Sequence, residues 1–309
     1  MLAALAILAA VSWWLGLNKD DGGKDDGDIV PGFYDKTVAE KETTPQATQT
    51  GTTEKKEEGT ETARREQRME YPAQLDGLSE QLLRREGYTV SYNKVRKVPN
   101  WVAWHLTAAH TNGRYYREGM EFLEDMEVPA PRATDDDYFQ SRYDRGHMCP
   151  SGDNKWSATA QRQSFLFSNM CPQNHGLNKG DWNDLEIQCR DWAKEMGDLY
   201  IVTGPVFYDG VKNTIGRHKV AVPDAFFKVV LADGRKAMAI GFIYPNKGGH
   251  KPMTHYVRTV DEVENITGMD FFPMLDDNVE DNVEATDRNT LIKQWHVDRN
   301  TSKGNLRSK

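Results

Sequence analysis

The sequence predicts an α+β domain built around a mostly antiparallel sheet, and three observations carry this prediction. Segments rich in aromatic and β-branched residues occur at 100–110, 199–207, 218–232 and 236–246. A single long amphipathic pattern, typical of a helix, spans residues 176–197. The order is therefore strand, loop, helix and then several strands, which favours an α+β arrangement.

The first part of this pattern runs from a strand into irregular chain. NWVAWHLTAAH at 100–110 alternates apolar and polar positions, and TNGR at 111–114 is a turn. Residues 117–142 contain two prolines and a charge run, so we expect mostly loop. YDRGHMCP follows at 143–150 as a strand that ends at its proline. The segment 157–173 begins with helix-compatible residues and becomes apolar.

The helix at 176–197 has the clearest pattern in the chain. Its apolar residues recur at spacings of three and four, and Gly197 is a natural stop. We expect both tryptophans of this helix in the core rather than stacked on bases, and we expect Cys189 to be a small buried hydrophobe. The apolar residues are Trp182, Leu185, Cys189, Trp192 and Met196.

The C-terminal half continues with strands and one further helix. The strands at 218–232 and 236–246 are joined by a tight DGR turn at 233–235. A short helix is expected at 259–268, with Thr259 as its N-cap.

Composition divides the 309 residues into four parts. Residues 1–17 are apolar and are expected to be a membrane anchor or a signal segment. Residues 18–70 are polar and have few large apolar groups, which predicts a disordered tether. The folded domain is expected over 71–275. Residues 276–309 are expected to be a mostly irregular tail, in which only LIKQW docks.

The apolar N-terminal segment favours an uncleaved anchor. It approaches the ~20 residues that span a bilayer, and its Trp13–Trp14 pair suits a membrane interface. Acidic residues follow at once, which suggests that the rest of the chain lies outside the cytoplasm, in a periplasm or on a cell surface. A cleaved signal, which would make the protein secreted, and a start Met assigned too late remain open alternatives.

The three cysteines leave at least one thiol unpaired within the chain, because their number is odd. Export would permit one disulfide. Cys149 and Cys171 are the candidate pair, since they lie within two neighbouring motifs, and whether they pair stays open.

The charge argues only weakly against a nucleic-acid partner. The net charge is −8, and residues 18–66 alone carry 13 acidic and 8 basic side chains. The folded core is therefore close to neutral, and a core of this kind can still carry a local basic groove.

The stretch Asp144-Arg145-Gly146-His147 combines groups that suit phosphate chemistry. A histidine is the usual general base near neutral pH, and an arginine holds a phosphate through a planar fork of donors. Gly146 would let a substrate backbone approach closely, and an aspartate can orient the histidine. Taken alone, the stretch is equally compatible with a structural histidine beside a salt-bridged arginine.

Three motifs in order make the resemblance specific. DRGH, then SNMCPQ, then LNKGDWNDLE resemble the DNA/RNA non-specific endonuclease family, whose members have the ββα-metal (His-Me finger) nuclease fold. VTGPV at 202–206 and VPDAFFKVV at 222–230 add further matches, so the resemblance covers roughly residues 70–275.

The resemblance implies a role for each matching residue. His147 would be the general base, and Asn178 the one direct protein ligand of a divalent ion, with water at the other positions. Glu186 would orient the metal's water shell, because two turns of a continuous helix place it ~12 Å from Asn178. Arg145 would contact the phosphate. Two residues, Asp144 and Asn169, would hold the site in shape.

The resemblance also implies a cofactor and phosphate contacts. A lone amide oxygen suits Mg²⁺, with Mn²⁺ as the alternative, better than Zn²⁺. A further upstream arginine is expected, and both Arg114 and Arg117 are candidates. Three basic residues flank the motifs as a possible phosphate-tracking patch, namely Lys155, Arg162 and Lys179. The partners would be DNA and RNA, and a homodimer is one expected assembly.

Other interpretations remain beside this one. His105, His110 and His175 are expected to be strand, loop and turn histidines. Cys149 with His147 could form a thiol hydrolase, since residues two apart on a strand share a face. The chain could also be a non-catalytic nucleic-acid-binding envelope protein on a degenerate nuclease scaffold, although it keeps the four main site residues of the motifs.

Overall fold

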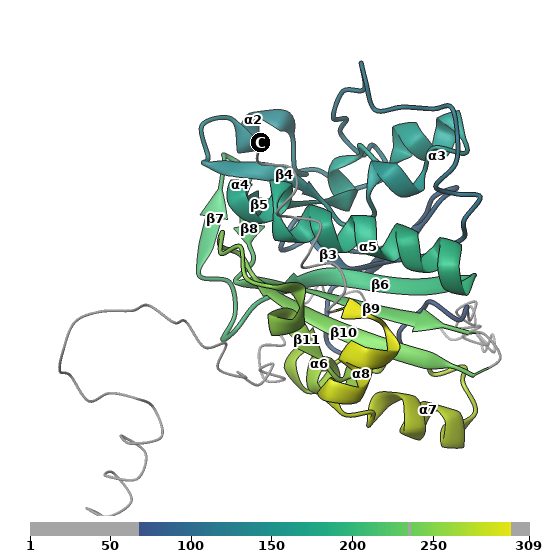
Figure 1. Ribbon diagram of the computed structural model, residues 1–309. Coiled ribbons are helices and arrows are strands. Elements are labelled where there is room, and N and C mark those ends of the chain that lie inside the picture. Colours follow the sequence, from purple (N-terminus) through teal and green to yellow (C-terminus); the bar gives the residue numbers. More distant parts are fainter. Residues whose placement is uncertain (1–67, 234–235, 298–309) are drawn as a thin grey trace, which may run out of the picture. The chain divides into compact units, whose positions relative to one another are not determined.

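The computed structural model describes residues 68–233 and 236–297, which form an α+β domain around one large sheet (Figure 1). The sheet is seven-stranded and antiparallel throughout, in the order β1-β2-β3-β6-β9-β10-β11. Its strands are β1 (Gln81–Arg84), β2 (Thr89–Asn93), β3 (Val98–Leu106), β6 (Leu199–Val206), β9 (Ala225–Ala232), β10 (Met238–Pro245) and β11 (Val257–Arg258). The predicted fold class is confirmed.

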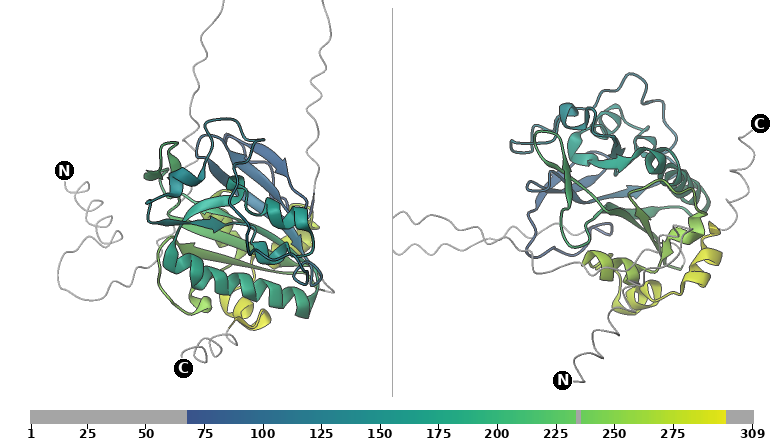
Figure 2. Two further views of the ribbon diagram at one scale, coloured as in Figure 1. Left: turned by 90° about the horizontal axis from the view of Figure 1, so that it is seen from above. Right: turned by 90° about the vertical axis from the view of Figure 1, so that its left-hand side faces the viewer.

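Helices cover both faces of this sheet (Figures 1 and 2). The long helix α5 (Asp181–Met196) lies on one face, where Trp182 contacts Phe226 and Tyr244. Helix α6 (Val260–Thr267) packs on the other face, and its Val263 would meet any side chain placed at Gly241. The expected N-cap of α6 is confirmed, because Thr259 and Glu262 form a reciprocal capping box.

Two elements that the sequence pattern joined are split in the structure. Residues 218–232 are not one strand, because Pro223 has no N–H for a ladder. β8 (Val220–Val222) pairs with β7 (Asn213–Ile215) in a separate hairpin, and β9 begins after Asp224. Residues 176–197 form α4 (His175–Lys179) and α5, with a break at Gly180, where an added Cβ would lie 2.6 Å from the Gly176 carbonyl oxygen.

The short strands β1 and β2 are not evident from the sequence pattern. The loop expected at 117–142 is confirmed, since only α2 (Asp135–Tyr138) is helical there. The helical start expected at 157–173 is also confirmed, as α3 (Ala158–Gln163), which is capped by Ser157. Of the DGR turn, residues 234–235 lie outside the described part, although β9 and β10 pair on either side of it.

The C-terminal residues differ from the expected irregular tail as far as 297. They form α7 (Asp277–Glu284) and α8 (Arg288–Gln294), and Leu291, Trp295 and Val297 are buried. Trp192 Nε1 donates to the Trp295 carbonyl oxygen at 2.8 Å. The predicted docking of LIKQW is therefore confirmed. The reason is that each short helix buries one apolar face, which a composition rich in Asp and Asn conceals.

The anchor and the tether cannot be compared with the structure, because residues 1–67 lie outside the described part. Among the described residues, no helix combines the length and the apolar character that a membrane span requires. All three cysteines are buried free thiols, so the disulfide is not formed. Cys171 lies opposite Gly146 in a strand ladder, whereas Cys149 is three residues further along and beyond the strand end.

Candidate active site

The three motifs come together in a small unit beside the main sheet. β4 (Tyr143–His147) pairs antiparallel with β5 (Met170–Asn174), and α4 follows β5 directly (Figure 1). This pair is a two-stranded sheet of its own. DRGH therefore lies on the first strand, and SNMCPQ enters the second. Asn178 follows on the helix, so the order is β, β, α.

Gly146 has a packing role in addition to the role expected from the sequence. A Cβ at this position would lie 2.3 Å from Gln173 Oε1 and 2.5 Å from Gln173 Cβ. The glycine is buried and lets the Gln173 side chain cross β4. Close approach of a substrate at Gly146 stays a prediction.

The side chain of Asp144 on β4 contacts two residues of α4. Asn178 Nδ2 donates to Asp144 Oδ2 at 2.9 Å, and His175 Nδ1 lies 3.0 Å from the same oxygen. Since the carboxylate is the acceptor, the amide nitrogen of Asn178 faces Asp144 and its Oδ1 points away, available to a cation. His175 begins α4 and is exposed, as a turn histidine would be, but it also contacts Asp144.

His147 is held in an aromatic setting that keeps its ring neutral. Its ring lies 5.0 Å from the Phe165 ring and 5.6 Å from the Phe122 ring, by centroids. The residue as a whole is half-buried, but its Nε2 is enclosed and has no hydrogen-bond partner among the described residues. Burial, and secondarily the charge of Arg117, lowers the pKa of His147 to about 3. A neutral imidazole can accept a proton.

Asn169 fastens the turn that follows His147. Its Oδ1 accepts from the Cys149 backbone N–H, and its Nδ2 donates to the backbone oxygens of Cys149 and Ser164, each at 2.9 Å. Asn169 is fully buried, so these bonds satisfy an amide that would otherwise be costly to bury.

Arg145 lies across a short acidic helix. Its Nε donates to Asp135 Oδ1 of α2 at 2.6 Å, and its Cζ lies 5.4 Å from the Phe122 ring centroid. No hydrogen bond within the described part occupies its two Nη groups, which suit a phosphate. Arg145 and His147 both lie against the Phe122 ring, so this ring connects the two side chains.

The structure separates the two upstream arginine candidates. Arg117 is exposed, lies 5.9 Å from the Phe165 ring and acts electrostatically on His147. Arg114 is exposed and instead lies over its neighbour Tyr115. Arg117 is therefore the candidate that the fold brings to the histidine.

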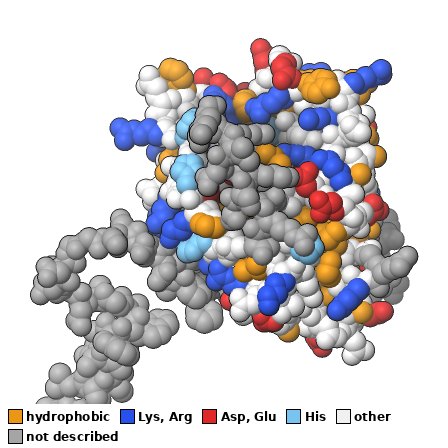
Figure 3. Space-filling model, viewed as in Figure 1, with side chains coloured by type: hydrophobic (Ala, Val, Ile, Leu, Met, Phe, Trp, Pro, Cys, Tyr) orange, Lys and Arg blue, Asp and Glu red, His pale blue; other side chains and the backbone are white. Residues whose placement is uncertain are grey.

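The three flanking cations lie on separate elements. Lys179 ends α4 and is exposed, whereas Lys155 precedes α3 and lies over Tyr116. Arg162, on α3, lines a cleft of about 1110 Å³ that also touches Phe122 and Asp135. On the face in Figure 3, Lys, Arg and His side chains gather on the side where Figure 1 places β7 and α4.

Glu186 lies in a partly buried charged layer between α5 and the sheet. Burial raises its pKa to about 7, against the opposing effect of Lys228 and Arg190. Arg190 Nη1 donates to Asp153 Oδ1 at 2.9 Å, and Trp104 Nε1 donates to Asp153 Oδ2 at 3.1 Å.

The sequence motifs do not reveal this layer. Asp153 is buried and fixes Arg190. Lys228 is 1% exposed, and its Nζ lies 4.6 Å from the Trp182 ring and 5.1 Å from the Trp104 ring. A lone lysine within the apolar strand AFFKVVLA was the available signal, because a buried charge requires compensating partners.

The donor set at this unit fits a hard cation that keeps most of its water. The side chains offer the Asn178 amide oxygen and, further along α5, the Glu186 carboxylate, both of which are oxygen donors. Among the described residues, the His175 imidazole shares Asp144 Oδ2 with the Asn178 amide, and all three thiols are buried. Asn178 would hold the ion, and water and substrate phosphate would complete its coordination.

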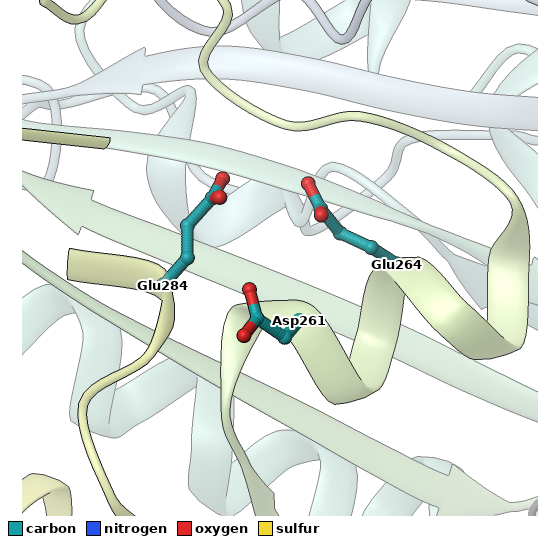
Figure 4. Close-up of side chains that lie close together, drawn as sticks. All are labelled: Asp261, Glu264 and Glu284. Carbon is teal, nitrogen blue, oxygen red and sulfur yellow. The ribbon is translucent and has the colours of Figure 1, made fainter. Parts of the chain in front are cut away.

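One carboxylate cluster lies away from this unit. Asp261 and Glu264 on α6 and Glu284 on α7 turn their carboxylates toward one another (Figure 4). Burial raises the pKa of Glu264 to about 7 and that of Glu284 to about 8, so these groups share protons near neutral pH. Protonation removes the charge repulsion that would otherwise keep these three carboxylates apart.

The antiparallel pair, the helix that follows it and the His147–Asn178 constellation define a ββα-metal nuclease unit. A family model described as DNA/RNA non-specific endonuclease matches residues 66–278, and the chain belongs to this family.

Curated relatives and one solved structure agree with this assignment. The chain is 36% identical over 205 residues to mitochondrial nuclease EXOG of Xenopus laevis, covering 61% of this chain and 57% of that protein. It is 38% identical over 216 residues to nuclease C1 of Cunninghamella echinulata var. echinulata, covering 65% of this chain and 86% of that protein. A chain in the crystal structure of the EndoG/EndoGI complex matches with a TM-score of 0.61 and 29% identity, over 64% of this chain and 87% of that chain.

The matches leave part of each sequence uncovered. The chain spans little more than half the length of the mitochondrial EXOG nucleases that it matches. Activity, substrates and partners of the whole protein are therefore argued below from its own residues.

Proposed function

We propose that the protein is a metal-dependent, sequence-nonspecific endonuclease that hydrolyses phosphodiester bonds in DNA and RNA. The observation that carries this proposal is the bond between β4 and α4: Asp144 orients the amide of Asn178 on α4, and the same strand carries the neutral, enclosed His147. Family membership supports the same reaction class.

His147 acts as the general base. Its Nε2 takes a proton from a water molecule as that water attacks phosphorus, and the bond to the 3′ oxygen breaks. The leaving 3′ oxygen takes a proton from solvent water, and His147 later returns its proton to solvent, so the products are a 5′-phosphate and a 3′-hydroxyl. An imidazole with a pKa of about 3 is unprotonated throughout the physiological range, and displacement of its aromatic cover by a polar substrate would make it a stronger base.

The arginines act on the phosphate. Arg145 offers its Nη groups from the edge of α2, and Arg117 approaches from the Phe165 side. Two guanidinium groups near one phosphate stabilise the extra negative charge of the transition state.

Asn178 would hold Mg²⁺, or Mn²⁺ in its place, which when bound stabilises the leaving oxygen as a Lewis acid. Asp144 keeps the ligand oxygen turned outward, and Glu186 orients the surrounding water from the next helix. The break at Gly180 turns α5 relative to α4, so the distance expected for one continuous helix does not apply.

Low sequence specificity follows from the kind of contact that the site offers. Cations and amides at this unit contact phosphate and metal, which are the same at every base pair.

Two other interpretations are less favoured. Cys149 is fully buried, accepts a hydrogen bond from Asn154, and burial raises its thiol pKa well above the usual value, which opposes a nucleophilic role. A non-catalytic nucleic-acid binder would not need a neutral, enclosed histidine beside two arginines.

The cellular setting also remains our proposal. The apolar residues 1–17 favour a membrane anchor with the nuclease domain outside the cytoplasm, or a secreted protein if the segment is cleaved. A homodimer is proposed from the family resemblance alone.

Plasmid cleavage by the full-length protein tests the proposal. Supercoiled plasmid is incubated with and without Mg²⁺, beside His147→Ala and Asn178→Ala. We expect nicking and degradation only with metal, and loss of at least 100-fold in each variant. A wild type that is inert with both Mg²⁺ and Mn²⁺ yet retards DNA on a gel would support the binder instead.

A further inference from the structure

A cationic groove lies away from the candidate active site. It encloses about 650 Å³ between the turn at 94–97, the hairpin β7–β8 and residues 77–79. Four of its lining residues are basic and none is acidic, namely Lys94, Arg96, Lys97 and Lys219. In a chain with a net charge of −8, this is a local reversal of sign.

Three acids adjoin lining residues in the sequence, namely Asp76, Glu80 and Asp209. Glu80 accepts a hydrogen bond from Ser91 at 2.7 Å. With all three included, the groove still has four basic groups against three acidic ones.

The turn that carries three of these cations is rigidly held. Asn93 Oδ1 accepts from the backbone N–H groups of Val95 and Arg96, at 3.0 and 2.9 Å. The Ala221 N–H of β8 donates to the Arg96 carbonyl oxygen at 3.0 Å. The Arg96 guanidinium lies over the Phe207 ring at 4.8 Å. Because the turn backbone and the Arg96 side chain are ordered before binding, an anion would lose little affinity to ordering these two.

The groove is linked to the DRGH strand through two contacts. Lys219 belongs to the turn between β7 and β8, and His218 in that turn bonds to Asp137 of α2, with both distances at 2.9 Å. The same helix carries Asp135, the partner of Arg145. β7, β8, α2 and β4 also lie at one side of the domain in Figure 1.

We propose that this groove binds the phosphodiester backbone of nucleic acid at a distance from the cleaved bond, as a second electrostatic contact for long substrates. The inference rests on the proposed nuclease function. A duplex carries a phosphate every ~3.4 Å along each strand, so a substrate longer than the catalytic unit offers phosphates to a neighbouring groove. Basic groups that contact backbone increase affinity without adding sequence preference.

The test compares charge variants of the full-length protein. Lys94→Ala, Lys97→Ala and Lys219→Ala are combined, while Arg96 is left in place because it packs on Phe207. A matched control removes three exposed lysines elsewhere, Lys194, Lys236 and Lys293. The corresponding triple Lys→Arg variant keeps the charge and separates charge loss from misfolding.

Binding is measured without metal by fluorescence anisotropy, on duplexes of increasing length and over a salt series. Each lost phosphate contact reduces the slope of log K against log salt by about 0.9, so the triple Ala variant should be shallower by about 2–3 on long duplex. The Lys→Arg variant should match wild type. On the shortest duplex, and in kcat, the triple Ala variant should also match wild type.

Two results would overturn the inference. One is a salt slope for the triple Ala variant equal to that of the control. The other is tight binding of inorganic phosphate or pyrophosphate that the triple Ala variant loses, with no dependence on duplex length, since this would define a small-anion site. Failure of wild-type cleavage with metal would remove the proposed function, while the metal-free binding result would still decide the groove.

Discussion

Asp144 Oδ2 accepts a hydrogen bond from Asn178 Nδ2 at 2.9 Å, so the first residue of DRGH fixes which end of the Asn178 amide is free. A carboxylate only accepts hydrogen bonds, whereas an amide has a donor end and an acceptor end. The strand therefore orients the candidate metal ligand on the helix.

Replacing Asp144 should weaken metal binding more than it weakens the fold. In Asp144→Ala the amide of Asn178 is free to rotate, and loss of such a supporting partner typically costs about 10–100-fold in metal affinity. Isothermal titration with Mn²⁺ measures this. Asp191→Asn, an exposed carboxylate paired with Lys194 on α5, is the control. Equal affinities in the two variants would contradict the orienting role of Asp144.

The rise of kcat/KM with pH on the acid side should be caused by ionisation of Glu186 rather than of His147. Burial raises the Glu186 pKa to about 7, so this carboxyl ionises as pH rises through neutrality, whereas His147 is already neutral above about pH 3. We expect kcat/KM on duplex to increase with pH through about 7. In Glu186→Gln the rate should be lower and nearly flat from pH 5 to 8. If kcat/KM of Glu186→Gln still rises with a midpoint near pH 6.5, the titrating group is His147.

Adding one methyl group at Gly146 should destabilise the protein. The Cβ of Gly146→Ala would lie 2.5 Å from Gln173 Cβ, and overpacking of this kind costs about 1–3 kcal/mol. Urea denaturation measures the loss. Gln173→Gly should recover part of it in the double variant, and Gly248→Ala, whose nearest contact is 3.5 Å, is the control. Full stability of Gly146→Ala would remove the packing explanation.

Stability should fall as pH rises through the range where the α6–α7 acids ionise. The pKa of Glu284 is about 8 in the fold against an ordinary value of 4.5, so between these values the folded protein binds more protons than the unfolded chain. Glu284→Gln should therefore be more stable than wild type at pH 8, by on the order of 1 kcal/mol after allowance for solvent screening. The two should be equal near pH 4. Thermal melts compare them, with the exposed Glu195→Gln as control, and a pH-independent difference would contradict the titration.

The strands and the motif residues could be predicted because their signals are local. Aromatic alternation marked β3, β6 and β10, and DRGH with LNKGDW marked the catalytic unit. The breaks at Gly180 and Pro223 are also local, but an apolar pattern that continues on both sides conceals them.

The rest depends on contacts between distant segments. The choice of Arg117 over Arg114 follows from where Phe165 lies, 48 residues further along the chain than Arg117. The burial of Lys228 follows from two tryptophans on different elements, one on β3 and one on α5. Asn178 and Asp144 are 34 residues apart, and no spacing rule reports the bond between their side chains.

The pairing of β4 with β5 outside the seven-stranded sheet separates two kinds of damage that mutation can cause. Asp144, His147, Asn169 and Asn178 all lie within one continuous stretch of the chain, while most of the buried apolar area belongs to strands and helices elsewhere. A weakened sheet therefore lowers the fraction of folded molecules without altering the turnover of those that remain folded. Natural variation in the sheet should change abundance, whereas variation in the short stretch, or at Arg117 and Glu186 outside it, should change the chemistry of each molecule.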